Sequence, residues 1–224
     1  MIPLRDVIPS RTTPYITVTI IVLNAIAWLF ELGLPRDVLP AFLQVYGIVP
    51  AEFRASTLVT SMFLHGSWMH VISNMWYLWI FGDNVEDRLG HLRYLAFYLL
   101  SGVVAALVQG HLFPASTIPT VGASGAISGV LGAFLILFPT ARVFTLIPLL
   151  LFFPVMELPA VLYLGIWFLM QLMSGTVSLR VVGDAGGVAW WAHVGGFVVG
   201  LVLAPLLRRR QSYPRVWRDQ YAPW

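Results

Sequence analysis

Long apolar stretches alternate with short polar ones along most of the chain, and this alternation predicts membrane-spanning helices. A helix needs about 20 predominantly apolar residues to cross the hydrocarbon core of a bilayer. By that measure we expect six spans, which cover residues 15–32, 57–81, 92–109, 124–138, 158–173 and 188–207. The apolar stretch at 143–156 contains two prolines, so we expect it to approach the membrane without crossing it. The predicted fold class is an all-α polytopic membrane bundle of six helices.

The flanks of these spans divide the chain into three parts. Residues 1–14 contain three prolines and predict a short, irregular lead, residues 15–207 form the membrane domain, and residues 208–224 form a basic tail with five arginines. Ala25 and Ala27 resemble the small residues of a signal-peptidase site, which leaves a cleaved leader as the alternative for the first span. The run stays apolar beyond Ala27, and this favours a retained span.

Composition favours a membrane protein over a soluble one. Hydrophobic side chains make up 58% of the 224 residues and charged ones only 10%, against roughly 25% charged residues in soluble domains. The chain has no cysteine, which excludes disulfides, thiol catalysis and thiolate metal sites. A basic tail is compatible with nucleic acid, but in a chain this apolar it favours anionic lipid headgroups. The lipid bilayer is therefore an expected partner, and nucleic acid is not.

The distribution of arginine predicts the orientation of the bundle. Six spans place both termini on one side of the membrane, and that side carries ten of the 13 arginines. The other side carries Arg36, Arg54 and Arg180. Because positive charge accumulates on the cytoplasmic side, both termini are expected in the cytoplasm. The predicted location is the cell inner (plasma) membrane, crossed several times.

A small set of polar side chains is expected inside the spans at a common depth. Ser124 lies in the glycine-rich segment 122–125 at the start of the fourth span, and His193 lies near the start of the sixth. Both are 14 positions from the inner end of their span, or roughly 21 Å. His70 and Asn74 are one helical turn apart and reach a similar level. Polar residues at membrane depth are costly, so they indicate function by default.

Small residues beside these positions allow the helices to approach closely. Gly125 and Gly129 form a small-xxx-small pair in the fourth span, and Gly196 and Gly200 form another in the sixth. Such pairs let two helix backbones come into contact. Ordinary helix packing explains the glycines, but it leaves a serine and a histidine at matched height unexplained.

These residues predict a serine–histidine dyad. Histidine is suited to take the proton of Ser124 as a general base, and His193 is the candidate. Asp184 is the only acid close in sequence to His193, and it lies in a predicted loop, so a dyad is favoured over a triad. The transition state also needs donors for an oxyanion, for which His70, Asn74 and the Ser124 backbone N–H are candidates.

Other catalytic chemistries fit the sequence less well. The segment at Ser124 is not a G-x-S-x-G nucleophile elbow, because Ala126 replaces the last glycine. His65 and His70 are five apart and lack the glutamate of an H-E-x-x-H zinc site. The two Gly-Asp pairs lie in predicted loops, which disfavours an aspartyl protease. Neither a metal nor a cofactor is expected.

Four segments carry a recognisable pattern in order and spacing: HGSWMHVISN at 65–74, NVEDRLG at 84–90, GASG at 122–125 and AHVGG at 192–196. Through them, residues 57–205 resemble the rhomboid family of intramembrane serine proteases, of the bacterial type. The resemblance implies a six-helix bundle that cleaves transmembrane segments of membrane proteins near their outer end. It implies Ser124 as nucleophile, His193 as base, and an oxyanion hole of His70, Asn74 and the Ser124 amide. It also implies motif-supporting roles for Gly122, Gly125 and Gly196.

Two alternatives to a protease remain open at this point. Inactive relatives of this fold bind membrane clients without cutting them, so a membrane chaperone or adaptor is the first, and a transporter is the second. Family members often carry a Trp-Arg pair in the first loop, where Ser56 and Thr57 stand here. The presence of Ser124 and His193 favours the enzyme, whose expected partners are transmembrane protein substrates.

Overall fold

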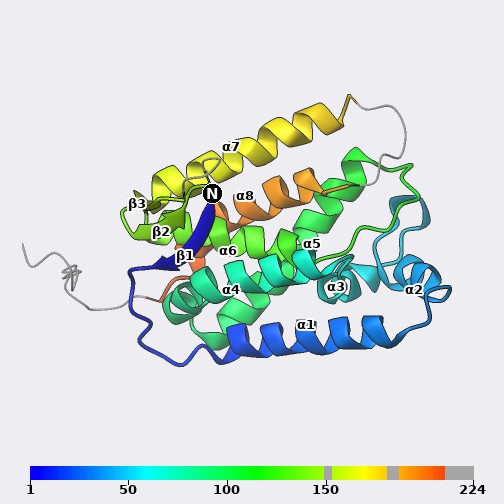
Figure 1. The fold of residues 1–224 in the computed structure, drawn as a ribbon, viewed down its shortest axis with the longest axis horizontal. Helices are drawn as coiled ribbons and strands as arrows, with labels where there is room; N and C mark the ends of the chain where they lie inside the picture. The colour runs from blue at the N-terminus through cyan, green and yellow to red at the C-terminus, as the bar shows by residue number, and fades with distance from the viewer. Residues whose placement is uncertain (149–152, 181–186, 210–224) are drawn as a thin grey trace, which may run out of the picture.

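The computed structural model describes residues 1–148, 153–180 and 187–209, and its main feature is a bundle of long helices. The bundle consists of α1 (Tyr15–Gly33), α4 (Trp68–Leu89), α5 (His91–Leu112), α6 (Ser124–Leu137), α7 (Ala160–Ser178) and α8 (Trp190–Leu207). α6 runs through the middle and packs against α4, α5, α7 and α8, while α1 lies on the outside against α4 (Figure 1). The predicted helical membrane bundle is confirmed.

Shorter elements lie at the two ends of the bundle. The connection from α1 to α4 contains α2 (Leu39–Tyr46), the 3-10 turn η1 (Pro50–Glu52), α3 (Thr57–Thr60) and the 3-10 turn η2 (Ser61–Phe63). At the opposite end, an antiparallel sheet in the order β1-β2-β3 contains β1 (Ile2–Asp6), β2 (Arg142–Leu146) and β3 (Val155–Pro159) (Figure 1).

The sheet corrects two predictions. The lead at 1–14 is predicted to be irregular, yet it contributes β1, and the stretch at 143–156, for which no strand is predicted, contributes to β2 and β3. Its approach to the membrane stays a prediction. In β2, buried Val143 and Thr145 alternate with more exposed neighbours, which is the two-residue period of a strand. β2 is the central strand and pairs with β1 on one side and with β3 on the other, so its backbone hydrogen bonds are satisfied without a helix.

Each of the six predicted spans corresponds to one of the long helices, but not all of the boundaries agree. Among the described helices, α1, α5, α7 and α8 are long and apolar enough to cross a membrane. α6 has only 14 residues, and α4 has 22 but carries charges in its last turns. The span predicted at 57–81 starts instead at Trp68, because the Ser67 hydroxyl caps the helix by accepting the His70 N–H at 3.2 Å. It also continues past residue 81, the predicted end of the span, to Leu89. Six crossings therefore stay a prediction.

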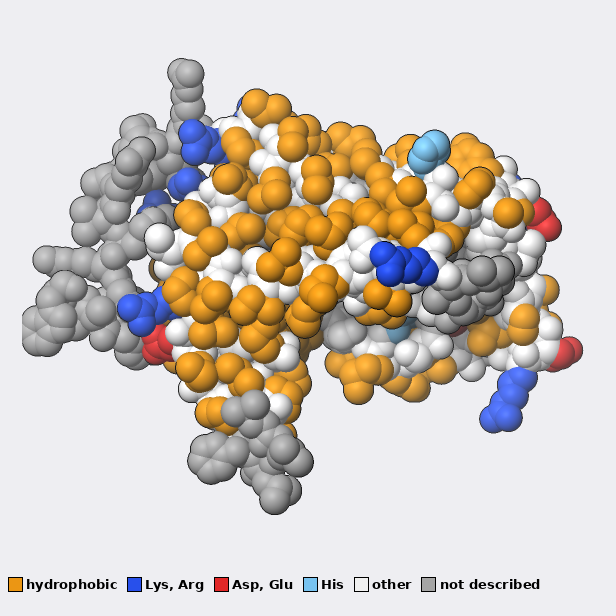
Figure 2. Space-filling model, turned by 90° about the horizontal axis from the view of Figure 1, so that it is seen from above, with side chains coloured by type: hydrophobic (Ala, Val, Ile, Leu, Met, Phe, Trp, Pro, Cys, Tyr) orange, Lys and Arg blue, Asp and Glu red, His pale blue; other side chains and the backbone are white. Residues whose placement is uncertain are grey.

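The outer faces of the helices are apolar. Large hydrophobic side chains are exposed on every candidate span, among them Leu29, Leu107, Leu169 and Val202. In Figure 2, hydrophobic side chains cover much of the middle of the face in view, and charged ones lie mostly toward the two ends of the long axis. A bilayer covers such a band, since hydrocarbon and not water contacts the helices there.

A buried carboxylate joins the helices at the sheet end. Glu86 of α4 is fully buried and accepts the backbone N–H groups of Ile16 and Thr17 at 2.9 and 2.8 Å. It also contacts Nδ1 of His91 in α5 at 2.6 Å. The first amides of a helix have no acceptor within the helix, so Glu86 fixes the start of α1 against α4 and α5. The opposite ends of α4 and α5 line the cavity described next.

Candidate active site

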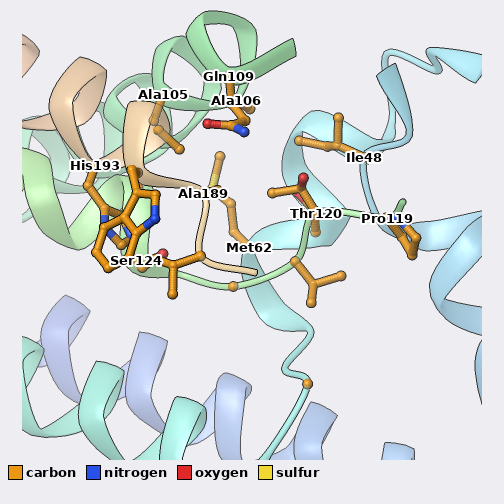
Figure 3. A pocket seen from close by; sticks show the side chains of 18 of the residues that line it. Ile48, Met62, Ala105, Ala106, Gln109, Pro119, Thr120, Ser124, Ala189 and His193 are labelled. Carbon is orange, nitrogen blue, oxygen red and sulfur yellow. The ribbon is translucent and has the colours of Figure 1, made fainter. Parts of the chain in front are cut away.

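A cavity of about 810 Å³ lies at the end of the bundle away from the sheet. Its walls come from the starts of α4, α6 and α8, the last half of α5, and the segment that precedes α6. It is lined by all four polar residues that the sequence singles out: Ser124, His193, His70 and Asn74. Figure 3 shows Ser124 and His193 on one side of the cavity, with Ile48 and Pro119 on the other.

Ser124 is the first residue of α6 and is half-buried. Backbone amides in the first turn of a helix lack an intrahelical acceptor, and the helix dipole adds partial positive charge there. Negative charge that develops beside Ser124 would therefore meet N–H donors. Ser128 lies one turn deeper, is buried, and donates its hydroxyl to the Ser124 carbonyl at 2.7 Å. The two serines thus differ in access to the cavity.

Glycines set the distance between α6 and α8. A Cβ atom on Gly196 would overlap the Gly125 carbonyl oxygen, and one on Gly200 would overlap the Gly129 carbonyl oxygen. On the side of α5, a Cβ on Gly125 would lie 2.7 Å from the Cβ of Ala105. Backbones approach this closely only where no side chain intervenes. These contacts bring together the helices that carry the predicted nucleophile and base.

His193 is buried in α8, and α7 contacts its ring. Its Nδ1 lies 2.8 Å from Gln171 Oε1, and the ring centroids of Trp167 and Trp190 lie 6.0 and 6.2 Å from that of His193. Since Nδ1 is engaged, Nε2 is the nitrogen left to contact Ser124. The described side chains of Ser124 and His193 form no hydrogen bond with each other, although both line the cavity. Catalytic hydrogen bonds often tighten only when substrate binds.

The wall contributed by α4 presents two donors to the cavity. Nδ1 of His70 accepts a long hydrogen bond of 3.5 Å from the Gly66 N–H, which places the ring proton on Nε2. A Cβ on Gly122 would lie 2.7 Å from His70 Nε2 and 3.7 Å from Asn74 Nδ2. Gly122 also has a φ of 125°, which side chains of L residues rarely adopt. Glycine at this position therefore leaves both donors open to the cavity.

His65 contacts Asn74, a role that the sequence does not reveal. Its Nε2 lies 3.0 Å from Asn74 Nδ2, and its backbone N–H donates to the buried carboxylate of Glu31 at 3.2 Å. Burial, with a smaller effect of the His70 charge, lowers the pKa of His65 to about 4. The neutral imidazole can therefore accept a hydrogen bond from the Asn74 amide N–H and fix the orientation of that amide. We predict His65 to be structural, and this contact gives it a specific partner.

The rhomboid domain model matches residues 52–210. The chain belongs to the rhomboid family. It is 29% identical to rhomboid-like protein 11, chloroplastic, of Arabidopsis thaliana over 88% of this chain and 69% of that protein. It is 31% identical to rhomboid protein 1, mitochondrial, of Saccharomyces cerevisiae (81% and 51%) and 32% identical to presenilin-associated rhomboid-like protein A, mitochondrial, of Danio rerio (75% and 43%). The chain thus spans about half of the yeast rhomboid and less of the fish one.

These relatives correct the predicted location. The rhomboids of Arabidopsis, yeast and Danio rerio named above are chloroplastic or mitochondrial, so they point to an organellar membrane, and the prediction of a plasma membrane is wrong. A multi-pass position in a membrane is supported. The arginine distribution orients helices across a membrane but carries no information on which membrane it is. The prediction of cytoplasmic termini therefore falls with the location, and these relatives do not support the bacterial type.

Gln171 is the residue beside the rhomboid cavity that sequence reasoning missed. It lies within the fifth predicted span, where the apolar pattern indicates only a membrane helix. The available signal was an amide at membrane depth, which is the same criterion that selects Asn74. Asp184, considered as the third member of a triad, lies outside the described residues.

Proposed function

We propose that this rhomboid is an intramembrane serine endopeptidase that cleaves transmembrane segments of other membrane proteins. The proposal rests on one observation: Ser124 at the start of α6 and the buried imidazole of His193 line the same cavity as His70 and Asn74. A serine hydroxyl becomes a useful nucleophile when a neighbouring base removes its proton. The cavity supplies that base together with donors for the charge that develops.

In the proposed reaction, His193 Nε2 takes the hydroxyl proton while Ser124 Oγ attacks the carbonyl carbon of the scissile peptide bond. The negative charge moves to the carbonyl oxygen, where His70 Nε2–H, the Asn74 amide and the Ser124 N–H donate hydrogen bonds. His193 then gives the proton to the leaving amine, which departs and leaves an acyl group on Ser124. Water attacks this ester with His193 again as base, which releases the acid and restores the hydroxyl.

The second half of this reaction needs water at membrane depth. The cavity of about 810 Å³ is many times the ~30 Å³ that one water molecule occupies in the liquid. Figure 3 shows Gln109 at its edge, and the Oε1 atom of this residue is buried without a hydrogen-bond partner among the described residues. A water molecule would satisfy such an acceptor, and this supports the cavity as the source of the water for deacylation.

The substrate must expose a peptide carbonyl to Ser124. In an intact helix each carbonyl is covered by the i→i−4 hydrogen bond, so the segment has to unwind near the cut. We expect preferred substrates to contain glycine, proline or other weak helix formers there.

A fluorophosphonate probe tests the proposal directly. In the detergent-purified protein we expect covalent labelling of Ser124, located by mass spectrometry of the modified peptide. Ser124→Ala should lose both labelling and cleavage of a model transmembrane substrate, and His193→Ala should match it. Ser128→Ala is the control and should keep both, because its hydroxyl is bonded within α6. Normal cleavage by Ser124→Ala would refute the assignment. Binding of substrates by an unlabelled wild-type protein would indicate the chaperone or adaptor instead.

A further inference from the structure

The contact between α7 and the base of the dyad involves two buried side chains. Gln171 is 6% exposed and His193 is 9% exposed, and Gln171 Oε1 lies 2.8 Å from His193 Nδ1. The two residues are 22 positions apart and come from different helices, so the contact depends on how α7 packs against α8. Buried polar groups that meet at this distance form a hydrogen bond. Which of the two atoms is the donor determines which tautomer of His193 the bond stabilises.

The direction of this hydrogen bond follows from the other end of the amide. Gln171 Nε2 donates to the Trp167 carbonyl at 3.3 Å, and a carbonyl can only accept. The amide oxygen must then face His193, and because oxygen only accepts, the proton lies on His193 Nδ1. The remaining nitrogen, Nε2, is therefore the unprotonated one. This tautomer is the one that can take a proton from a serine hydroxyl.

A second contact holds α7 in register with α8. Trp191 Nε1–H donates to the Gly175 carbonyl at 2.9 Å, one helical turn after Gln171. A Cβ on Gly175 would lie 3.1 Å from that same nitrogen, so the indole lies directly against the α7 backbone. The orientation of the amide toward His193 is thus supported from both sides along α7.

We propose that Gln171 is a positioning residue that holds His193 in its Nδ1–H tautomer with Nε2 directed at Ser124. The inference rests on the proposed protease function and adds α7 to the helices that form the site. A carboxylate would hold the same proton, but it would bury a charge at membrane depth, which an amide avoids. The neutral amide therefore takes the position that an aspartate holds in a serine–histidine–aspartate triad.

Replacing Gln171 by methionine keeps the length of the side chain and removes the acceptor. Nδ1–H then has no partner, and the tautomer with the proton on Nε2 becomes populated because an unpaired buried donor is unfavourable. We expect kcat to fall about 10–100-fold with KM unchanged. Gln171→Glu restores an acceptor and should recover at least about 10-fold over Gln171→Met at pH 8, with the acid limb of its pH–kcat profile moved to higher pH because the carboxylate stabilises the imidazolium.

The experiment measures cleavage of a transmembrane substrate in detergent and the ¹⁵N NMR shifts of His193 for each full-length variant. The control is Gln44→Met, which makes the same change in α2, where the amide donates to Thr117 O at 3.3 Å. Thermal unfolding shows whether each variant is folded. The NMR shifts report the tautomer without any need for activity.

The proposal predicts an Nδ1–H tautomer in the wild type, a mixture in Gln171→Met, and wild-type behaviour in Gln44→Met. A Gln171→Met kcat within twofold of wild type would overturn it. So would a fall in kcat with an unchanged tautomer, or a Gln171→Glu variant no better than Gln171→Met. If Ser124 proves not to be the nucleophile, the protease proposal fails while the NMR result still decides whether Gln171 fixes the histidine.

Discussion

The close contact between α6 and α8 makes Gly196→Ala a sensitive test of how the site is held. A Cβ at this position would overlap the carbonyl oxygen of Gly125, which is backbone and cannot turn aside as a side chain can. Ordinary non-bonded contacts need about 3.5–4 Å, so α8 would have to move away from α6 by on the order of 1 Å. His193 is one turn from Gly196 on α8 and would move with it.

Two effects of different size follow from this displacement. Overpacking a tight interior lowers the free energy of unfolding by about 1–3 kcal/mol, and we expect the bundle to stay folded after such a loss. A misplacement of about 1 Å between reacting groups can lower a rate by about 10²-fold. The effect on catalysis should therefore exceed the effect on folding.

The matched control is Gly165→Ala in α7, where a Cβ would meet nothing within 4 Å. Alanine is a better helix former than glycine by about 0.5–1 kcal/mol, so this variant should be slightly more stable and fully active. The assay compares cleavage of a transmembrane substrate in proteoliposomes with thermal unfolding in detergent. A Gly196→Ala variant with wild-type kcat would show that the glycine contact does not set the catalytic geometry.

Three further single variants test the oxyanion donor, its neighbour and the sheet end. Asn74→Ala should lower kcat about 10²–10³-fold, the usual loss for one oxyanion donor. His65→Ala should act through Asn74, so the double variant should lose no more activity than Asn74→Ala alone. Additive losses in the double variant would contradict the contact between the two side chains. Burial raises the pKa of Asp6 from 3.8 to about 7, and the Asp83 charge adds to this increase. The stability that protonated Asp6 contributes is therefore present below about pH 4 and is lost as the pH rises through about 7. Asp6→Asn should raise the thermal midpoint at pH 8 and flatten its pH dependence over that range, and an unchanged dependence would refute this.

The long helices are predictable because each carries its own signal. An apolar run of about 20 residues requires a helix in lipid whatever it packs against. The start of α4 is a different case, since the segment 57–63 is apolar enough to extend the run, yet it forms α3 and η2. Gly66 and Ser67 are a breaker and a helix cap, and together they could have placed the start at Trp68.

The sheet could not be predicted from local pattern. Ile2 pairs with Leu146, so the helices α1, α4, α5 and α6 separate β1 from its partner in the sequence. No window of a single sequence contains both strands. Each strand has only five residues, and an apolar strand of that length cannot be told from a piece of helix by its pattern.

Some parts of the site can be predicted from the type of residue, and other parts depend on contacts between helices. Ser124 and His193 stand out because a hydroxyl and an imidazole are costly at membrane depth. The pairing of Gln171 with Nδ1 of His193, and of His65 with Asn74, depends on which helix faces lie together. Periodicity gives the face of one helix but not the rotation of its neighbour, so these partners emerge only from packing.

The two ends of the bundle use different electrostatics, and this difference is what the proposed catalytic site needs in order to work at membrane depth. The sheet end holds the buried carboxylate of Glu86 and the carboxyl group of Asp6, whose pKa is raised. Both groups join segments that are distant in sequence. The described residues that line the cavity include no aspartate, glutamate or arginine. There the groups are hydroxyl, amide and imidazole, which are polar but neutral. In a low-dielectric site, fixed dipoles stabilise developing charge without the desolvation penalty of an ion. Such dipoles act only if they point correctly, so the glycine contacts between α6 and α8 and the amide of Gln171 matter to this site as much as its reacting atoms.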